Sequence, residues 1–152
     1  MTSGPEPVGT LDVALAHAEK LLVSQPDLAA EQAREILGAV PNHPAATLLL
    51  AMARRRSNDV AEALRILEPL AASQPRWAVA QRELGLALGD AGRGEEAVAA
   101  LRTAVRLQPT MADAWRALGD HLHAMGDTAG ADQAYANHIR NSTRDPRLME
   151  PA

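Results

Sequence analysis

Three prolines divide this chain at equal intervals. Pro41, Pro75 and Pro109 stand thirty-four residues apart, and the segments between them align residue by residue. A sequence that repeats itself about every 20–50 residues is typical of a solenoid. Each unit of a solenoid buries its apolar face only against its neighbours. The period therefore indicates a repeat architecture.

The repeat register gives four units when each unit starts three residues after its proline. These units span residues 10–43, 44–77, 78–111 and 112–145. Residues 1–9 form a short Gly/Pro/Ser-rich tail that cannot bury enough apolar surface to order itself. Residues 146–152 look like the start of a further helix that is cut short, so we expect the chain to be a piece of a longer protein.

Each unit is predicted to be a pair of α-helices. Apolar residues recur at helical intervals on both sides of a short break near Asn58, Gly92 and Gly126. Asparagine and glycine adopt the left-handed conformation that ends a helix, and the proline of each unit stops its second helix. The small residues Gly85 and Gly119 on first helices would let paired helices approach to about 8–10 Å.

Composition excludes several classes of function. The chain has 47% hydrophobic but only 2% aromatic residues, so the predicted core is alanine and leucine. It has no cysteine, which excludes disulfides and thiolate metal sites. A net charge of −4 argues against a nucleic-acid surface, and no segment reaches the roughly 18 apolar residues of a membrane span. We expect a soluble, cytoplasmic protein that binds neither nucleic acid nor membrane.

The register resembles the tetratricopeptide repeat (TPR) pattern. The fourth unit carries this resemblance in its large and small positions, which are Trp115, Leu118, Gly119, Leu122, Gly126, Ala131 and Tyr135. The third unit follows in register, and the first fits loosely, as is usual for an end unit. The resemblance implies an all-α, right-handed superhelical solenoid of antiparallel helix hairpins.

The resemblance also implies a binding surface, because first helices of TPR arrays line a concave groove. The residues at the groove positions are Leu48, Met52, Arg55, Arg56, Arg82, Leu86, Asp90, Arg116, Asp120 and His123. The leucines and the methionine would form an apolar strip, and guanidinium groups beside it can hold carboxylates by two parallel hydrogen bonds. We predict a non-catalytic interaction module that binds a partner peptide or helix through an apolar anchor beside an acidic group. The alternative is that these charges form an ordinary solvated helix face.

No pattern in the sequence indicates catalysis, a metal or a cofactor. His121 and His123 are two residues apart, so on a helix they point in different directions and do not share a metal ion. We expect His121 to pack between hairpins and His123 to face the groove. The sequence also lacks a Gly-rich phosphate loop after a strand. We therefore predict that this chain is not an enzyme in itself.

Two other functions stay open. Residues 135–148 are similar to bacterial TPR-sulfotransferase chains, which implies an N-terminal segment that recruits or orients substrate for an enzyme whose chemistry lies beyond Ala152. The last hairpin would also leave Ala134, Tyr135 and Ile139 without a neighbour. Exposed apolar residues of this kind favour self-association, which predicts a weak homodimer through the end helices.

Overall fold

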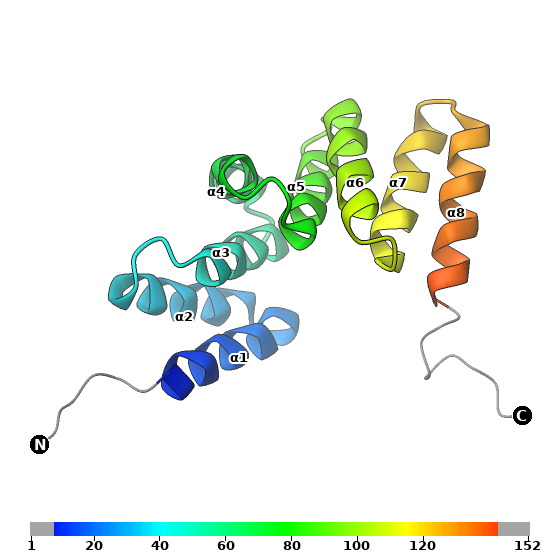
Figure 1. The fold of residues 1–152 in the computed structure, drawn as a ribbon. Coiled ribbons are helices and arrows are strands. Elements are labelled where there is room, and N and C mark those ends of the chain that lie inside the picture. Colours follow the sequence, from blue (N-terminus) through cyan, green and yellow to red (C-terminus); the bar gives the residue numbers. More distant parts are fainter. Residues whose placement is uncertain (1–7, 143–152) are drawn as a thin grey trace, which may run out of the picture. The chain divides into compact units, whose positions relative to one another are not determined.

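The computed structural model describes residues 8–142 and contains only α-helices in that range. In chain order they are α1 (Val8–Ser24), α2 (Pro26–Ala39), α3 (Pro44–Arg56), α4 (Val60–Ser73), α5 (Ala78–Asp90), α6 (Gly94–Leu107), α7 (Ala112–Ala124) and α8 (Thr128–Ser142) (Figure 1). Helices α3, α5 and α7 begin at the first residues of the predicted units. The predicted further helix at 146–152 lies outside the described residues.

The first helix begins earlier than the sequence indicated. Helix α1 starts at Val8, so the last two residues of the predicted tail 1–9 are helical. Gly9 lies in the first turn, and glycine carries its full cost of about 1 kcal/mol only in a helix interior. The first seven residues of the predicted tail lie outside the described range.

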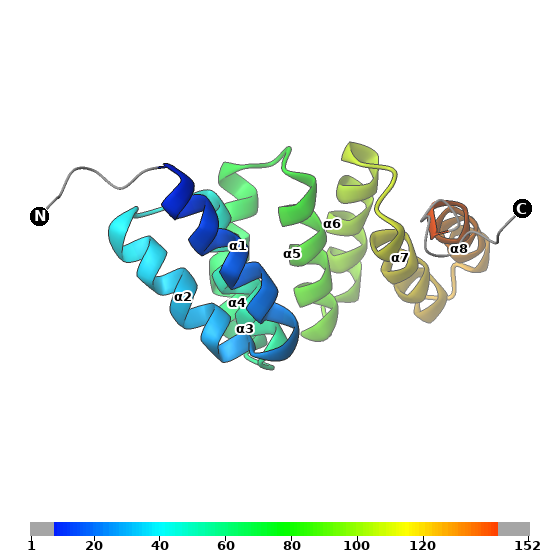
Figure 2. The ribbon, with the colours of Figure 1, turned by 90° about the horizontal axis from the view of Figure 1, so that it is seen from below.

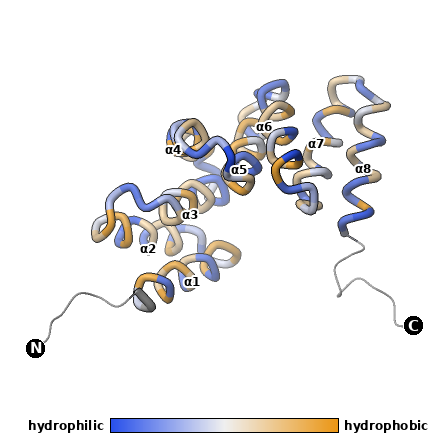
Figure 3. Tube along the Cα trace, in the orientation of Figure 1, coloured by the Kyte–Doolittle hydropathy of each residue, from blue (hydrophilic) through white to orange (hydrophobic). Residues whose placement is uncertain are grey.

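The helices form antiparallel hairpins joined by short turns. In the second half of the chain α5 packs on α6, α6 on α7, and α7 on α8, and the two views in Figures 1 and 2 agree on this order. Hydrophilic residues alternate with hydrophobic ones along the helices (Figure 3), as the helical periodicity requires. The predicted all-α hairpin architecture is confirmed.

The turns inside three of the hairpins share one backbone motif. Asn58, Gly92 and Gly126 have positive φ angles of 67°, 79° and 85°. The residue after each of them donates its backbone N–H to a carbonyl five residues earlier, with N–O distances of 2.8, 2.9 and 2.9 Å. This is the Schellman arrangement, in which a left-handed residue ends the helix and satisfies its last carbonyls. The predicted breaks are therefore in the right places.

The prolines also act where the register placed them. Helices α2, α4 and α6 end two residues before Pro41, Pro75 and Pro109. The register did not anticipate Pro69, which lies inside α4. Proline has no backbone N–H, so α4 lacks one hydrogen bond of its ladder at that residue.

The chain also divides into two compact units, each larger than one repeat, and the boundary between them falls between Leu70 and Ala71. We call residues up to Leu70 the first compact unit and residues from Ala71 the second compact unit. In the first compact unit, α1, α2 and α3 contact one another. Their shared core is made of small residues and leucines, namely Ala18, Leu22, Ala29, Ala30, Ala33, Leu49 and Ala53.

The second compact unit has its own core. Buried residues of α5, α6, α7 and α8 form one cluster, and Trp115 and Tyr135 pack against it from the side. Leu101 of α6 is fully buried there. Trp115 and Tyr135 therefore cover an aliphatic core, in agreement with the alanine and leucine core predicted from the low aromatic content.

Candidate functional site

The predicted groove residues fall on the first helices of three hairpins. Helix α3, in the first compact unit, carries Leu48, Met52, Arg55 and Arg56. Helices α5 and α7 carry Arg82, Leu86, Asp90, Arg116, Asp120 and His123 in the second compact unit.

On α3, most of the predicted apolar strip is used in packing. Leu48 is only 6% exposed, and Met52 packs against the core of the first compact unit. Arg55 is half-buried and Arg56 is exposed at the end of the helix. Of these four side chains, Arg56 is therefore the one most open to a partner.

In the second compact unit the first helices α5 and α7 touch each other. A Cβ atom placed on Gly89 would lie 2.7 Å from Cε1 of His121, so the imidazole ring lies directly against the backbone of α5. His121 thus packs between hairpins, as its position predicted. Its neighbour His123 is exposed.

Arg82 is held by two carboxylates of its own chain. Its Nη2 lies 3.3 Å from Oε2 of Glu83, and its Nη1 lies 3.5 Å from Oδ2 of Asp113 on α7. Glu83 is 2% exposed, and a buried carboxylate needs such a partner. The Nε of Arg82 is buried and has no hydrogen-bond partner within residues 8–142. Arg82 therefore links α5 to α7 and is largely neutralised before any partner arrives.

Asp120 is also engaged within the chain. It accepts a hydrogen bond of 2.6 Å from the hydroxyl of Tyr135 on α8. This hydrogen bond, together with burial and the carboxylate charge, raises the pKa of Tyr135 above its ordinary value. Asp120 nevertheless stays exposed on its other side, so it still contributes negative charge to the surface.

What remains on α5 and α7 is a surface of mixed charge. We call it the first-helix surface, and it consists of Leu86, Asp90, Arg116, Asp120 and His123. Leu86 is half-buried and the other four are exposed. The aspartates offset the arginine, so this surface is not a general anion-binding site.

A side-chain link recurs in the second compact unit with the period of the repeat. Trp115 donates its Nε1–H to the carbonyl of Pro109 at 2.8 Å. Thirty-four residues earlier, Gln81 donates from Nε2 to the carbonyl of Pro75 at 3.2 Å. Both links fasten a first helix to the end of the preceding repeat. Sequence reasoning missed them, although the shared register offered the signal.

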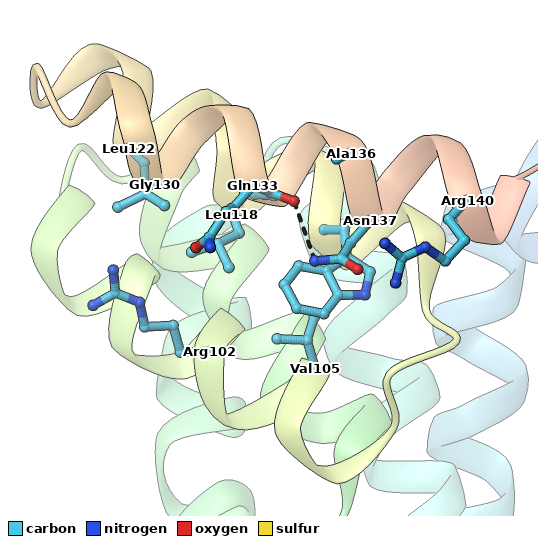
Figure 4. Close-up of a pocket in the computed structure, with 11 residues that line it drawn as sticks. Arg102, Val105, Leu118, Leu122, Gly130, Gln133, Ala136, Asn137 and Arg140 are labelled. Carbon is cyan, nitrogen blue, oxygen red and sulfur yellow. Dashed lines mark hydrogen bonds between the residues drawn. The ribbon is translucent and has the colours of Figure 1, made fainter.

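The second compact unit also contains a pocket of about 510 Å³ that the sequence analysis did not anticipate. It lies between α6, α7 and α8 (Figure 4). Its lining residues are Arg102, Val105, Trp115, Leu118, Leu122, Gly130, Gln133, Ala134, Ala136, Asn137 and Arg140. A second hollow of about 410 Å³ lies in the first compact unit between α1 and α2, and it is mainly apolar.

Small residues on α8 gave a signal for the larger pocket. Gly130 and Ala136 occupy the positions at which the preceding repeat, residues 78–111, carries Glu96 and Arg102. Two long charged side chains are therefore replaced by a hydrogen atom and a methyl group. This exchange leaves room beside α6.

The described part of the chain contains neither a cluster of metal ligands nor a membrane-spanning helix. Across residues 8–142, no three His, Asp or Glu side chains are grouped so that they could hold a metal ion. In the same range, no helix combines the length and the apolar character needed to cross a bilayer.

A sequence profile of the tetratricopeptide repeat matches residues 19–78 and 82–146. The chain belongs to the tetratricopeptide repeat family. The matches cover most of its length, and they confirm the resemblance that the repeat register carried. Family membership supports a role as a protein-interaction scaffold.

Solved structures show the same fold in this TPR chain and in MamA proteins. One crystal structure of MamA is 17% identical, with 90% of this chain and 81% of that chain covered at a TM-score of 0.74. A MamA segment from Desulfovibrio magneticus RS-1 is 21% identical, with 90% and 77% covered at a TM-score of 0.74. MamA from AMB-1 is 21% identical, with 88% and 80% covered at a TM-score of 0.70. No curated protein sequence matches the chain significantly.

Proposed function

We propose that this TPR chain is a non-catalytic interaction module that binds a peptide or helix of a partner protein on the concave side formed by its first helices. The observation that carries the proposal is the first-helix surface of α5 and α7. It combines one half-buried leucine with four exposed polar side chains. Such a combination suits a partner that offers both an apolar side chain and a charge.

The internal ion pairs limit which charge the partner should carry. Arg82 already faces Glu83 and Asp113, so Arg116 is the arginine of this surface that a partner carboxylate can pair with. Asp120, which accepts a hydrogen bond from a neutral hydroxyl and so keeps its charge, would repel further carboxylates. We therefore expect a partner segment with a single acidic residue next to an apolar one that contacts Leu86.

The proposal is tested by changing Arg116 to glutamate. Peptides that bind the full chain would be selected from a displayed random library, and their affinities would be measured by fluorescence anisotropy. R116E should weaken peptides of the predicted kind at least about ten-fold, which corresponds to about 1.4 kcal/mol. The salt dependence of the remaining binding should flatten, because a screened charge pair has been removed.

Arg106 on α6 gives a matched control, because it is exposed but lies on a second helix. R106E changes the net charge by the same amount and should leave these affinities within two-fold, on the order of 0.4 kcal/mol. Equal affinities of the wild-type chain and R116E would contradict the proposal.

Self-association is a second candidate, because Ile139 on α8 is 60% exposed. This apolar side chain on the last described helix offers a contact point for another copy of the chain. Static light scattering over a wide concentration range tests this candidate. A dimer that I139D abolishes would support it, whereas a constant monomer mass would exclude it.

The remaining alternative is a segment that recruits substrate for a sulfotransferase-type enzyme. It depends on sequence beyond Ala152, and it makes the same demand on the first-helix surface, since the array would then bind the protein substrate of that enzyme. The R116E measurement therefore also bears on this alternative.

A further inference from the structure

The geometry points to a second binding site on a different face of α7. We propose that the pocket between α6 and α8 binds an extended acidic peptide segment through one bulky apolar side chain. This inference goes beyond the proposed function, because α6 and α8 contribute nothing to the first-helix surface. The two sites share only α7.

The floor of the pocket can hold an apolar side chain. Val105, Leu118 and Leu122 line it and are themselves 3–5% exposed. Trp115 also lines it, and the hydrogen bond from its Nε1 to Pro109 holds the indole in place. The volume of about 510 Å³ lies inside the range of about 300–1,000 Å³ that is usual for ligand pockets. A leucine or an aromatic side chain therefore fits.

Two guanidinium groups lie at opposite ends of this floor. Arg102 comes from α6 and Arg140 from the last turns of α8 (Figure 4). Within residues 8–142, Arg102 is paired with no carboxylate. Arginine binds carboxylates through two parallel hydrogen bonds. Arg102 can therefore hold a carboxylate of an extended chain whose apolar side chain enters the pocket. Arg140 already interacts with other residues of this chain, and it adds positive charge at the other end of the floor.

An amide on α8 favours a peptide over other acidic molecules. The side chain of Asn137 is held by a hydrogen bond of 3.1 Å from its Nδ2 to the backbone carbonyl of Gln133. Its Oδ1 can still accept a hydrogen bond. A peptide backbone supplies N–H donors at regular intervals, whereas a lipid phosphate or a sulfate supplies none. The apolar floor, the guanidinium group of Arg102 and the amide acceptor of Asn137 together match an acidic peptide.

The experiment again uses peptides selected by the full chain, now sorted by variants of the pocket. R102E reverses one cation, and A136W fills the open side of the pocket from α8. The conservative variant R102K keeps the charge, and R116E on the first-helix surface is the matched control. Thermal melting monitored by circular dichroism verifies that each variant is folded. Arg102 is exposed, so R102E keeps the test informative even if A136W fails to fold.

A second readout places the bound peptide. The chain has two tryptophans, so the indole N–H signals of Trp77 and Trp115 can be told apart by NMR with the variant W77F. Peptide binding in the pocket should shift the Trp115 signal. It should leave the Trp77 signal unchanged.

We expect a class of selected peptides, rich in acidic residues around one bulky apolar residue, that binds R102E and A136W at least ten-fold more weakly. R116E should bind this class as the wild type does, and R102K should retain most of the affinity. If no selected peptide depends on Arg102, or if the Trp115 signal does not move, the inference is overturned. Peptides that depend on Arg116 alone would support the proposed function and still overturn this second site.

Discussion

Hairpins α5–α6 and α7–α8 place different side chains at the same point of closest approach. A Cβ on Gly85 would lie 2.6 Å from Cγ of Leu101, and a Cβ on Gly119 would lie 2.7 Å from Cε1 of Tyr135. Both hairpins therefore require a glycine opposite the side chain that fills the interface. Leu101 is fully buried, whereas Tyr135 is half-exposed.

The residue that follows each of these glycines differs as well. The third repeat has Leu86 where the fourth repeat has Asp120, which accepts the hydrogen bond of Tyr135. One hairpin is thus closed by apolar packing, and the other by packing together with a polar link at its edge. The comparison teaches that the repeat fixes where two helices meet but leaves open which chemistry holds them.

The largest expected effect is a loss of stability in the hairpin α5–α6, which is closed by apolar packing. Leu101→Ala removes a side chain that is 0% exposed, so it should lower the free energy of unfolding by about 2–5 kcal/mol. Urea unfolding followed by circular dichroism measures this loss. Leu107→Ala on the same helix is the control, because Leu107 is only half-buried and should cost less. A loss below about 1 kcal/mol for Leu101→Ala would show that the core collapses around the gap.

The next prediction sets the two glycines against each other. Gly85→Ala should destabilise the chain by about 1–3 kcal/mol, because the new methyl group meets the buried Leu101 and the core is overpacked. Gly119→Ala should cost clearly less, since the half-exposed ring of Tyr135 can swing away. The helix preference of alanine over glycine, about 0.5–1 kcal/mol, offsets both costs equally. Chemical unfolding of both variants under the same conditions gives the difference. Equal costs would mean that exposure of the filling side chain does not matter.

A smaller effect concerns the links to the prolines. Trp115→Phe removes the indole hydrogen bond to Pro109, which should cost about 0.5–1.5 kcal/mol. Gln81→Ala, which removes the longer link to Pro75, should cost less than that. Denaturant titration of both variants ranks the links. A larger loss for Gln81→Ala would reverse the order we infer from the distances.

The smallest effect is a shift in the titration of Tyr135, the only tyrosine of the chain. Its hydrogen bond to Asp120 raises its pKa, so Asp120→Ala should move the midpoint of the phenolate absorbance to lower pH. A raised folded-state pKa stabilises the fold below about pH 10, and this contribution is lost as the pH rises through the folded-state value. Asp113→Ala, also exposed on α7, should leave the midpoint unchanged. An identical midpoint in Asp120→Ala would show that the hydrogen bond does not persist in solution.

The sequence predicted the features that the backbone imposes. Positive φ angles at Gly92 and Gly126 and the close approach at Gly85 and Gly119 follow from residue types that few other positions tolerate. The thirty-four-residue register transfers such requirements from one unit to the next. The hairpins could therefore be placed before any coordinates were known.

The surface chemistry was harder to predict, because it depends on neighbours that the register does not specify. Arg82 was expected to be available, but one of its partners follows it directly and the other, Asp113, comes from the next first helix. The pocket beside α6 arises from side chains that are missing at Gly130 and Ala136. The pattern of charged and apolar residues in the sequence does not reveal such gaps.

Helix α7 has a property that neither surface has by itself. It presents Arg116, Asp120 and His123 on one face, and Trp115 and Leu118 on another. A displacement of this single helix would alter both faces together. Any such coupling is reciprocal, so a ligand that favours one placement of α7 changes the affinity at the other face by the same factor in both directions. Two partners that never contact each other would thus influence each other's affinity through the position of α7.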